Sequence, residues 1–136
     1  AFTHYETIGG GAGGGPGGPG ISARHTHMTN TRNTPIEALE RSFPVRVLRA
    51  SVRRGSGGAG LHAGGDGIVK ELRFLVPVEV SWLGGRQRSG PPGLSGGGPG
   101  QPGGLELRPS GQSPWRRLEP IDRGELPSGG ELRVLT

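Results

Sequence analysis

The residues best suited to chemistry gather in one polar stretch, residues 22–34, where hydroxyl, amide and imidazole groups follow one another with few charges. Imidazoles carry protons or bind metals, and amide or guanidinium groups can donate hydrogen bonds to a developing oxyanion. In an extended backbone alternate side chains share a face, so the two histidines could bind one metal or share a proton. The alternative is that these side chains hydrogen-bond irregular backbone and hold neighbouring loops together. The candidate catalytic residues are His25, His27, Asn30, Arg32 and Asn33.

Other titratable residues are expected to have structural roles. Glu6 could act as a general base or a ligand, but we expect an exposed or backbone-capping carboxylate. His4 and His62 accompany no second reactive group and are expected on the surface, and Asp66 is expected to form a turn. No Ser-His-Asp spacing is present, and no Gly-Lys-Ser/Thr sequence follows the glycines, so neither a hydrolase triad nor a phosphate loop is predicted.

Composition indicates one small domain with an irregular backbone. The 136 residues include 30 glycines and 13 prolines, and only 29% are hydrophobic, a composition that approaches low complexity. The glycines of residues 9–20 match a G-x-G-x-x-G pattern, but no clear strand precedes them and no helix follows, so they predict a loop. We expect a modest core that is more stable when it is packed against something larger.

Charge and residue usage exclude several classes of protein. The net charge of +5 comes from scattered arginines without interleaved aromatic residues, so nucleic acid is not an expected partner. The absence of cysteine excludes disulfides and thiolate metal sites. No signal peptide or membrane-spanning stretch is evident, and a cytoplasmic protein without a membrane partner is the expectation.

The pattern of apolar residues predicts a mainly β (α+β) fold: an antiparallel sheet, one short helix and long Gly/Pro-rich loops. A capping box at Thr34 and Glu37, with Pro35 at the first helical position, predicts a short helix that ends before Pro44. Residues 45–52, 68–76 and 78–83 predict three strands of one sheet, and shorter strands are expected at 105–108, 115–118 and 131–135. Residues 1–34 are expected to form a glycine loop and polar segment, and residues 35–136 a single small mainly-β region.

Several motifs occur in a consistent order along the chain. They are Tyr5-Glu6-Thr7-Ile8 with the glycines that follow, Thr26-His27-Met28-Thr29-Asn30-Thr31-Arg32-Asn33-Thr34, Gly64-Gly65-Asp66-Gly67-Ile68-Val69, Glu71-Leu72-Arg73-Phe74 and Pro92-Gly93-Leu94-Ser95-Gly96-Gly97. This series resembles the B subunit of the hydantoinase B/oxoprolinase family, from about Phe2 to Thr136. Family B subunits are several times longer, so the resemblance implies the C-terminal part of one, with a fold that is incomplete without the remaining part.

The resemblance implies hydrolysis of cyclic amides such as 5-oxoproline and hydantoins. An A subunit is expected to bind ATP with Mg and phosphorylate the amide oxygen, and the B subunit to help hydrolyse the activated lactam. A divalent metal could take part, and the family's metal-binding regions are expected nearer the N-terminus of the B subunit. Expected partners are the remainder of the B subunit, the A subunit and a cyclic amide, in an oligomer. The alternatives are a non-catalytic assembly module, a remnant of such a subunit that is inactive alone, or part of a related ketone carboxylase.

Overall fold

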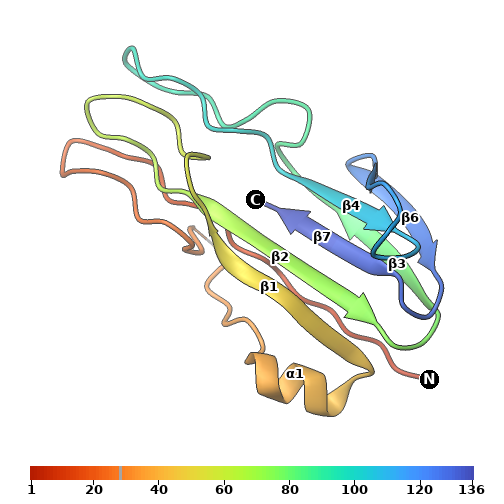
Figure 1. The fold of residues 1–136 in the computed structure, drawn as a ribbon. Coiled ribbons are helices and arrows are strands. Elements are labelled where there is room, and N and C mark those ends of the chain that lie inside the picture. The colour runs from red at the N-terminus through yellow and green to blue at the C-terminus, as the bar shows by residue number, and fades with distance from the viewer. Residues whose placement is uncertain (28) are drawn as a thin grey trace.

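A computed structural model describes residues 1–27 and 29–136, so Met28 of the polar segment lies outside the described residues. It confirms a mainly β fold with antiparallel sheets, one short helix in the described part of the chain and long glycine- and proline-rich loops (Figure 1). The elements are α1 (Ile36–Ser42), β1 (Val45–Arg53), β2 (Gly67–Phe74), β3 (Val78–Leu83), β4 (Gly104–Arg108), β5 (Arg116–Arg117), β6 (Ile121–Leu126) and β7 (Glu131–Leu135).

The larger sheet has five strands in the order β1-β2-β7-β4-β5, and every neighbouring pair is antiparallel. The last strand along the chain, β7, therefore lies in the middle, between β2 and β4 (Figure 1). Leu132 of β7 is level with Leu72 on one side and Leu107 on the other. Because side chains alternate along a strand, these leucines define an inner apolar face, which also carries Lys70, and leave the other charged residues of these strands on the outer face.

The remaining strands, β3 and β6, pair only with each other and form a two-stranded ribbon. The prediction that residues 78–83 join the sheet of residues 45–52 and 68–76 was wrong in this respect, although all three strands exist. The strand β6 was not predicted. A two-stranded ribbon is marginal by itself, and this one is stabilised by packing its inner face against the larger sheet.

The core lies between the inner face of the five-stranded sheet and the ribbon. Leu105 and Leu107 of β4, Leu126 of β6 and Leu39 of α1 are all buried in one cluster. Ile8 of the N-terminal segment packs against the same cluster. The N-terminal segment thus follows the sheet, as Figure 1 shows, before the chain turns into its first glycine loop.

The helix α1 begins one residue later than the capping box predicted. Its N-cap is Pro35, with no side-chain capping hydrogen bond, so the predicted cap by Thr34 was wrong. The N–H of Thr34 instead donates to Oε1 of Glu6 at 3.3 Å. This contact ties the residue before the helix to the N-terminal segment, and the helix is held by packing Leu39 into the core.

Three glycine-rich loops, residues 9–20, 55–65 and 90–103, lie side by side at one end of the molecule (Figure 1). We call them the glycine layer. Gly65 N–H donates to the carbonyl of Ala12 at 2.8 Å, and Gly98 N–H donates to the carbonyl of Ala59 at 2.7 Å, so the central loop bonds to both neighbours. A Cβ at Gly11 would overlap the Gly65 carbonyl oxygen. The glycines therefore permit backbone-to-backbone contact that a side chain would prevent.

Candidate functional site

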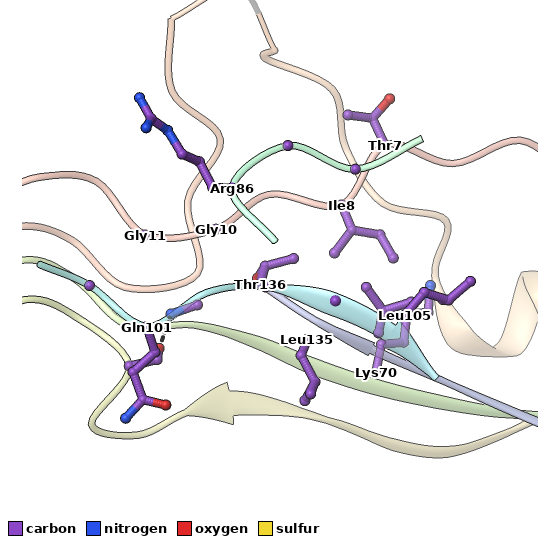
Figure 2. Close-up of a pocket in the computed structure, with 18 of the residues that line it drawn as sticks. Thr7, Ile8, Gly10, Gly11, Lys70, Arg86, Gln101, Leu105, Leu135 and Thr136 are labelled. Carbon is purple, nitrogen blue, oxygen red and sulfur yellow. Dashed lines mark hydrogen bonds between the residues drawn. The ribbon is translucent and has the colours of Figure 1, made fainter. Parts of the chain in front are cut away.

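A groove of about 1930 Å³ opens between the five-stranded sheet, the N-terminal segment and the ribbon. Figure 2 shows Thr7, Ile8, Gly10 and Gly11 along one wall and Leu105, Leu135 and Thr136 on the sheet side. Its apolar lining continues on the ribbon with Val80 and Trp82. Its apolar lining with a few charged groups resembles that of small-molecule sites, but its volume exceeds the ~300–1,000 Å³ of such sites, so a small ligand would occupy only part of it.

A buried ion pair lies on the wall of this groove. Lys70, on the inner face of β2, donates from Nζ to Oε2 of Glu6, and the two side chains are 8% and 11% exposed. His4 Nε2 lies 4.0 Å from the same carboxylate oxygen, and its ring lies 5.0 Å from the Phe43 ring. Of the two roles expected for Glu6, the structure shows backbone capping, since the carboxylate accepts from the N–H of Thr34, and it does not show an exposed side chain.

The surroundings of Glu6 keep it ionised. Burial raises the pKa of Glu6, but hydrogen bonds from Lys70 and Asn33, the Lys70 charge and the Thr34 N–H outweigh it and lower the pKa below its ordinary value. A carboxylate stabilised in this way is a poor proton acceptor near neutral pH. Its chemistry favours holding Lys70 in place as a charged donor over acting as a general base.

The polar segment meets this ion pair at its C-terminal end. Asn33 Nδ2 lies 3.5 Å from the carbonyl of Thr7 and also contributes a hydrogen bond to Glu6. Asn33 is the predicted site residue that the described structure brings to the groove wall, and it approaches from behind the N-terminal segment. None of the five predicted site residues lines the groove itself.

His25 and His27 occupy different environments. Both ring nitrogens of His25 are buried with no hydrogen-bond partner among the described residues, and its ring packs on Gly9, where a Cβ would come within 3.0 Å of Cδ2. His27 is exposed and has a left-handed φ of 57°. The extended backbone that would have put both imidazoles on one face therefore does not continue through His27, and a site shared by the two histidines stays a prediction.

Asn30 and Arg32 are exposed, and the structure gives them no place in the groove. Their catalytic roles, like those of the two histidines and Asn33, stay predictions. Within residues 1–27 and 29–136, no three His, Asp or Glu side chains are grouped to hold a metal ion. The sequence has no Gly-Lys-Ser/Thr loop, and the described residues group no carboxylates for a metal, so ATP and Mg stay expected on the A subunit.

Two residues on the groove were missed from the sequence. Lys70 is the only lysine of the chain and lies between Val69 and Leu72 in its most apolar stretch, which is a usable signal of a paired buried charge. Arg86 follows two glycines in a loop, and nothing in that sequence indicates that it has a left-handed φ of 55° at the rim of the groove (Figure 2).

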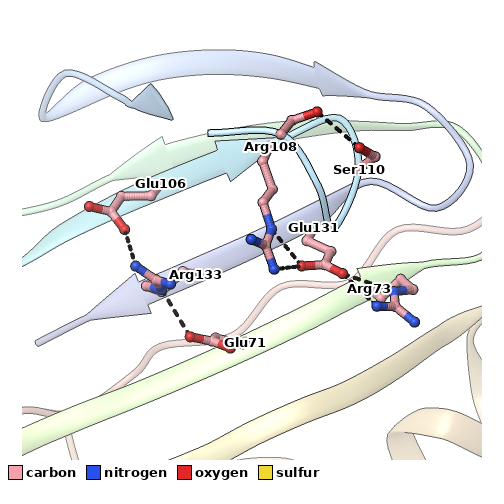
Figure 3. Close-up of polar contacts among 8 residues, drawn as sticks. Glu71, Arg73, Glu106, Arg108, Ser110, Glu131 and Arg133 are labelled. Carbon is pink, nitrogen blue, oxygen red and sulfur yellow. Dashed lines mark hydrogen bonds and ion pairs between the residues drawn. The ribbon is translucent and has the colours of Figure 1, made fainter. Parts of the chain in front are cut away.

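The outer face of the five-stranded sheet carries a separate network of charges (Figure 3). Glu131 of β7 is fully buried and accepts hydrogen bonds from Arg73 of β2 and Arg108 of β4. Arg133, two residues along β7, bridges Glu71 and Glu106 on the same two strands at 2.9 and 3.0 Å.

The Trp115 ring lies 4.2 Å from the guanidinium carbon of Arg108 and 4.1 Å from that of Arg133. Burial raises the pKa of Glu131, but the two arginines outweigh it and lower the pKa overall. These contacts join β2, β7 and β4, so we assign the network to stability.

The chain is thus a glycine-rich, mainly β segment in which the N-terminal segment and parts of the glycine loops line one groove. Its residues 1–135 match the family described as hydantoinase B/oxoprolinase, and the chain belongs to that family. It is 51% identical over 96 residues to 5-oxoprolinase 1 of Arabidopsis thaliana and 48% identical over 94 residues to 5-oxoprolinase of Dictyostelium discoideum. A Pseudomonas protein provisionally named as the B subunit of a D-/L-hydantoinase is 33% identical over 107 residues.

These matches cover 71%, 69% and 79% of this chain, but only 8%, 7% and 18% of the three relatives. The chain therefore spans less than a tenth of the length of the two 5-oxoprolinases. No solved structure matches it. Among the described residues there is no helix with the length and apolar character needed to cross a bilayer.

Proposed function

We propose that this chain is the C-terminal part of the B subunit of an ATP-dependent cyclic-amide hydrolase of the 5-oxoprolinase or hydantoinase type. The observation that carries the proposal is the family match over residues 1–135, together with relatives named 5-oxoprolinase at about half identity. Its expected partners are the rest of the B subunit and an A subunit. The Pseudomonas relative, named as one subunit of a hydantoinase, supports an assembly of more than one chain.

An unactivated amide is a poor electrophile, so in this proposal ATP bound to the A subunit would transfer its terminal phosphoryl group to the lactam oxygen and leave as ADP. Water would then add to the carbonyl carbon, the ring C–N bond would break with the nitrogen leaving as an amine, and the phosphate would be released. The groove of this chain would receive the ring on its apolar wall. Lys70, paired with Glu6, would then donate a hydrogen bond where negative charge develops, an arrangement that stabilises such transition states.

Glu6 has a positioning role in this scheme. It holds the Lys70 ammonium group in place, and it also connects the groove to Asn33 and Thr34 of the polar segment. The polar segment supplies the residues predicted to carry protons and to donate to an oxyanion. Because four of them lie away from the groove, their direct participation is the part of the proposal that most needs a test.

The test uses the assembled complex of A and B subunits with ATP and 5-oxoproline, and it follows glutamate release. Wild-type turnover is expected, and His27→Ala and Asn30→Ala should each lower kcat by about 100-fold or more, the usual contribution of a proton-transfer or oxyanion group. Both side chains are exposed, so neither substitution should disturb packing. Gln112→Ala, at an exposed amide outside the groove, is the matched control.

The outcomes separate the parts of the proposal. A wild-type complex that opens no cyclic amide would reject the hydrolase assignment. Full turnover in both variants would remove the polar segment from the catalytic residues and favour the alternative of an assembly module within an active enzyme. Incorporation of bicarbonate into a ketone by the same complex would favour the related carboxylase.

A further inference from the structure

The imidazole of His4 lies on the groove wall beside the Glu6–Lys70 ion pair. The N-terminal segment runs along the sheet (Figure 1), and alternate side chains of this segment face inward. Ile8 packs against the leucine core, and Glu6 pairs with Lys70. His4 Nε2 lies 4.0 Å from the Glu6 oxygen that accepts from Lys70, whereas Tyr5 is 87% exposed. His4 therefore stands next to two charged groups, which its sequence context did not indicate.

Aromatic packing holds the His4 ring in this position. Its centroid lies 5.0 Å from that of Phe43, at an interplanar angle of 54°. Phe2 packs on the same Phe43 ring at 5.4 Å. The His4 side chain keeps 26% of its surface exposed, so water in the groove can reach the ring. The imidazole is thus fixed by its neighbours without being sealed in the core.

An imidazole beside an ionised carboxylate is the arrangement by which proteins orient a general base. The carboxylate favours a proton on the nearer ring nitrogen and leaves the other nitrogen to accept one. Glu6 suits this role because its pKa is lowered and it stays ionised. The separation of 4.0 Å exceeds a hydrogen bond, and such contacts often shorten only when the substrate is bound. Lys70 contacts the same carboxylate oxygen, so a hydrogen-bond donor lies next to the proton carrier.

We propose that His4 is the catalytic residue that carries the proton during opening of the lactam ring. This inference rests on the proposed function and assigns to the groove wall a task that the polar segment does not bring there. The imidazole takes a proton from water as the water oxygen bonds to the carbonyl carbon. It gives that proton to the ring nitrogen as the C–N bond breaks and its electron pair goes to nitrogen, and it is then neutral again.

The first experiment compares wild type with His4→Phe in the assembled complex, with ATP and 5-oxoproline. Phenylalanine keeps an aromatic ring on Phe43 but carries no proton. We expect kcat to fall by about 100- to 10,000-fold, the usual contribution of a general acid or base, with KM and the thermal midpoint unchanged. Wild-type kcat in His4→Phe would show that the ring serves only in packing and would overturn the proposal.

The second experiment restores the base chemically. His4→Gly leaves space on the groove wall, and added imidazole should recover turnover. Pyrazole is a ring of the same size and far weaker basicity, so it is the matched control and should not recover turnover. Equal recovery with the two rings, or recovery with neither, would reject proton transfer by His4.

The outcomes for His4 and for the proposed function are distinguishable. A wild-type complex that opens no cyclic amide rejects the proposed function and the role of His4 with it. An active wild-type complex with full turnover in His4→Phe rejects the role of His4 alone and leaves the hydrolase assignment standing.

Discussion

At the level of single residues, the Glu6 carboxylate joins three segments that are far apart in the sequence. It belongs to the N-terminal segment, accepts from Thr34 before α1, and pairs with Lys70 on β2. Both members of the pair are nearly buried. The position of the polar segment relative to the groove therefore depends on one carboxylate and its cation.

Removing Lys70 should disturb this junction strongly. Lys70→Met leaves a buried carboxylate without its partner, a change that costs about 3–5 kcal/mol in comparable sites. We expect amide hydrogen exchange in the intact protein to speed up at Thr34, whose N–H donates to Glu6, and along β2.

The double variant Glu6→Leu/Lys70→Met is the informative control. Replacing both charges with apolar groups leaves no unpaired ion, so it should be less destabilising than Lys70→Met alone. If the double variant loses as much stability as the single variants Glu6→Leu and Lys70→Met lose together, the pair is not coupled.

The sequence indicates one member of this pair, Lys70, but not its partner. A sole lysine within an apolar strand indicates a buried charge in need of a partner, whereas the partner lies 64 residues away along the chain. Spacing along a sequence cannot reveal such a contact, because it arises only when the N-terminal segment packs on β2. The same limit applies to Asn33, whose approach to Glu6 depends on where the polar segment enters α1.

At the level of elements, the glycine layer is the feature that composition indicated least accurately. The glycine-rich stretches predicted loops but gave no sign that these loops bond to one another through their backbones. The reason is steric: without Cβ atoms, neighbouring chains approach until the amide of one reaches the carbonyl of the next.

Two glycines of the N-terminal loop provide a matched test. Gly11→Ala places a Cβ on the Gly65 carbonyl, whereas a Cβ at Gly13 meets nothing within 4 Å. We expect Gly11→Ala to separate the loops and abolish the protection of the Gly65 amide from hydrogen exchange, because that amide donates to Ala12. Gly13→Ala should leave this protection unchanged, and equal effects of the two substitutions would contradict the steric explanation.

The strands were largely predictable and their pairing was not. Alternation located β1, β2 and β3, but it carries no information on which strands become neighbours, and β3 joined β6 instead of β1 and β2. The strand β6 was missed because Gly124 in its middle and prolines on both sides, Pro120 and Pro127, are typical of loops. A Cβ at Gly124 would overlap Leu107, so this glycine allows the ribbon to approach the core closely.

At the level of the whole molecule, three carboxylates link stability to pH in the same direction. Glu6 and Glu131 have lowered pKa values because their cationic partners outweigh burial, and the Gly57 N–H together with other backbone donors lowers the pKa of Asp66. A carboxyl group with a lower pKa in the folded state binds fewer protons than in the unfolded state. Its stabilisation is therefore complete above the ordinary pKa and is lost as the pH falls through the folded value.

We predict that the thermal midpoint of the intact protein is insensitive to these three groups between about pH 6 and 8 and falls below about pH 4.5. Glu131→Gln should lower the midpoint at neutral pH, because Arg73 and Arg108 lose a buried charged acceptor, an effect of roughly 3 kcal/mol.

The thermal midpoint of Glu131→Gln should also fall less steeply than that of wild type as the pH is lowered. Glu125→Gln, at an exposed position of β6, serves as the control. If the thermal midpoint of Glu131→Gln falls as steeply at low pH as that of wild type, protonation of this network does not cause the loss of stability in acid.

The glycine layer also makes one end of the molecule respond to temperature differently from the other. The heat capacity of unfolding rises with newly exposed apolar surface and falls with exposed peptide groups. Opening loops that are joined by amide–carbonyl bonds releases mostly peptide groups, whereas separating the ribbon from the sheet exposes leucines. Because apolar burial stabilises less on cooling, the packing of the leucine core should weaken in the cold, whereas the amide–carbonyl hydrogen bonds of the glycine layer should not.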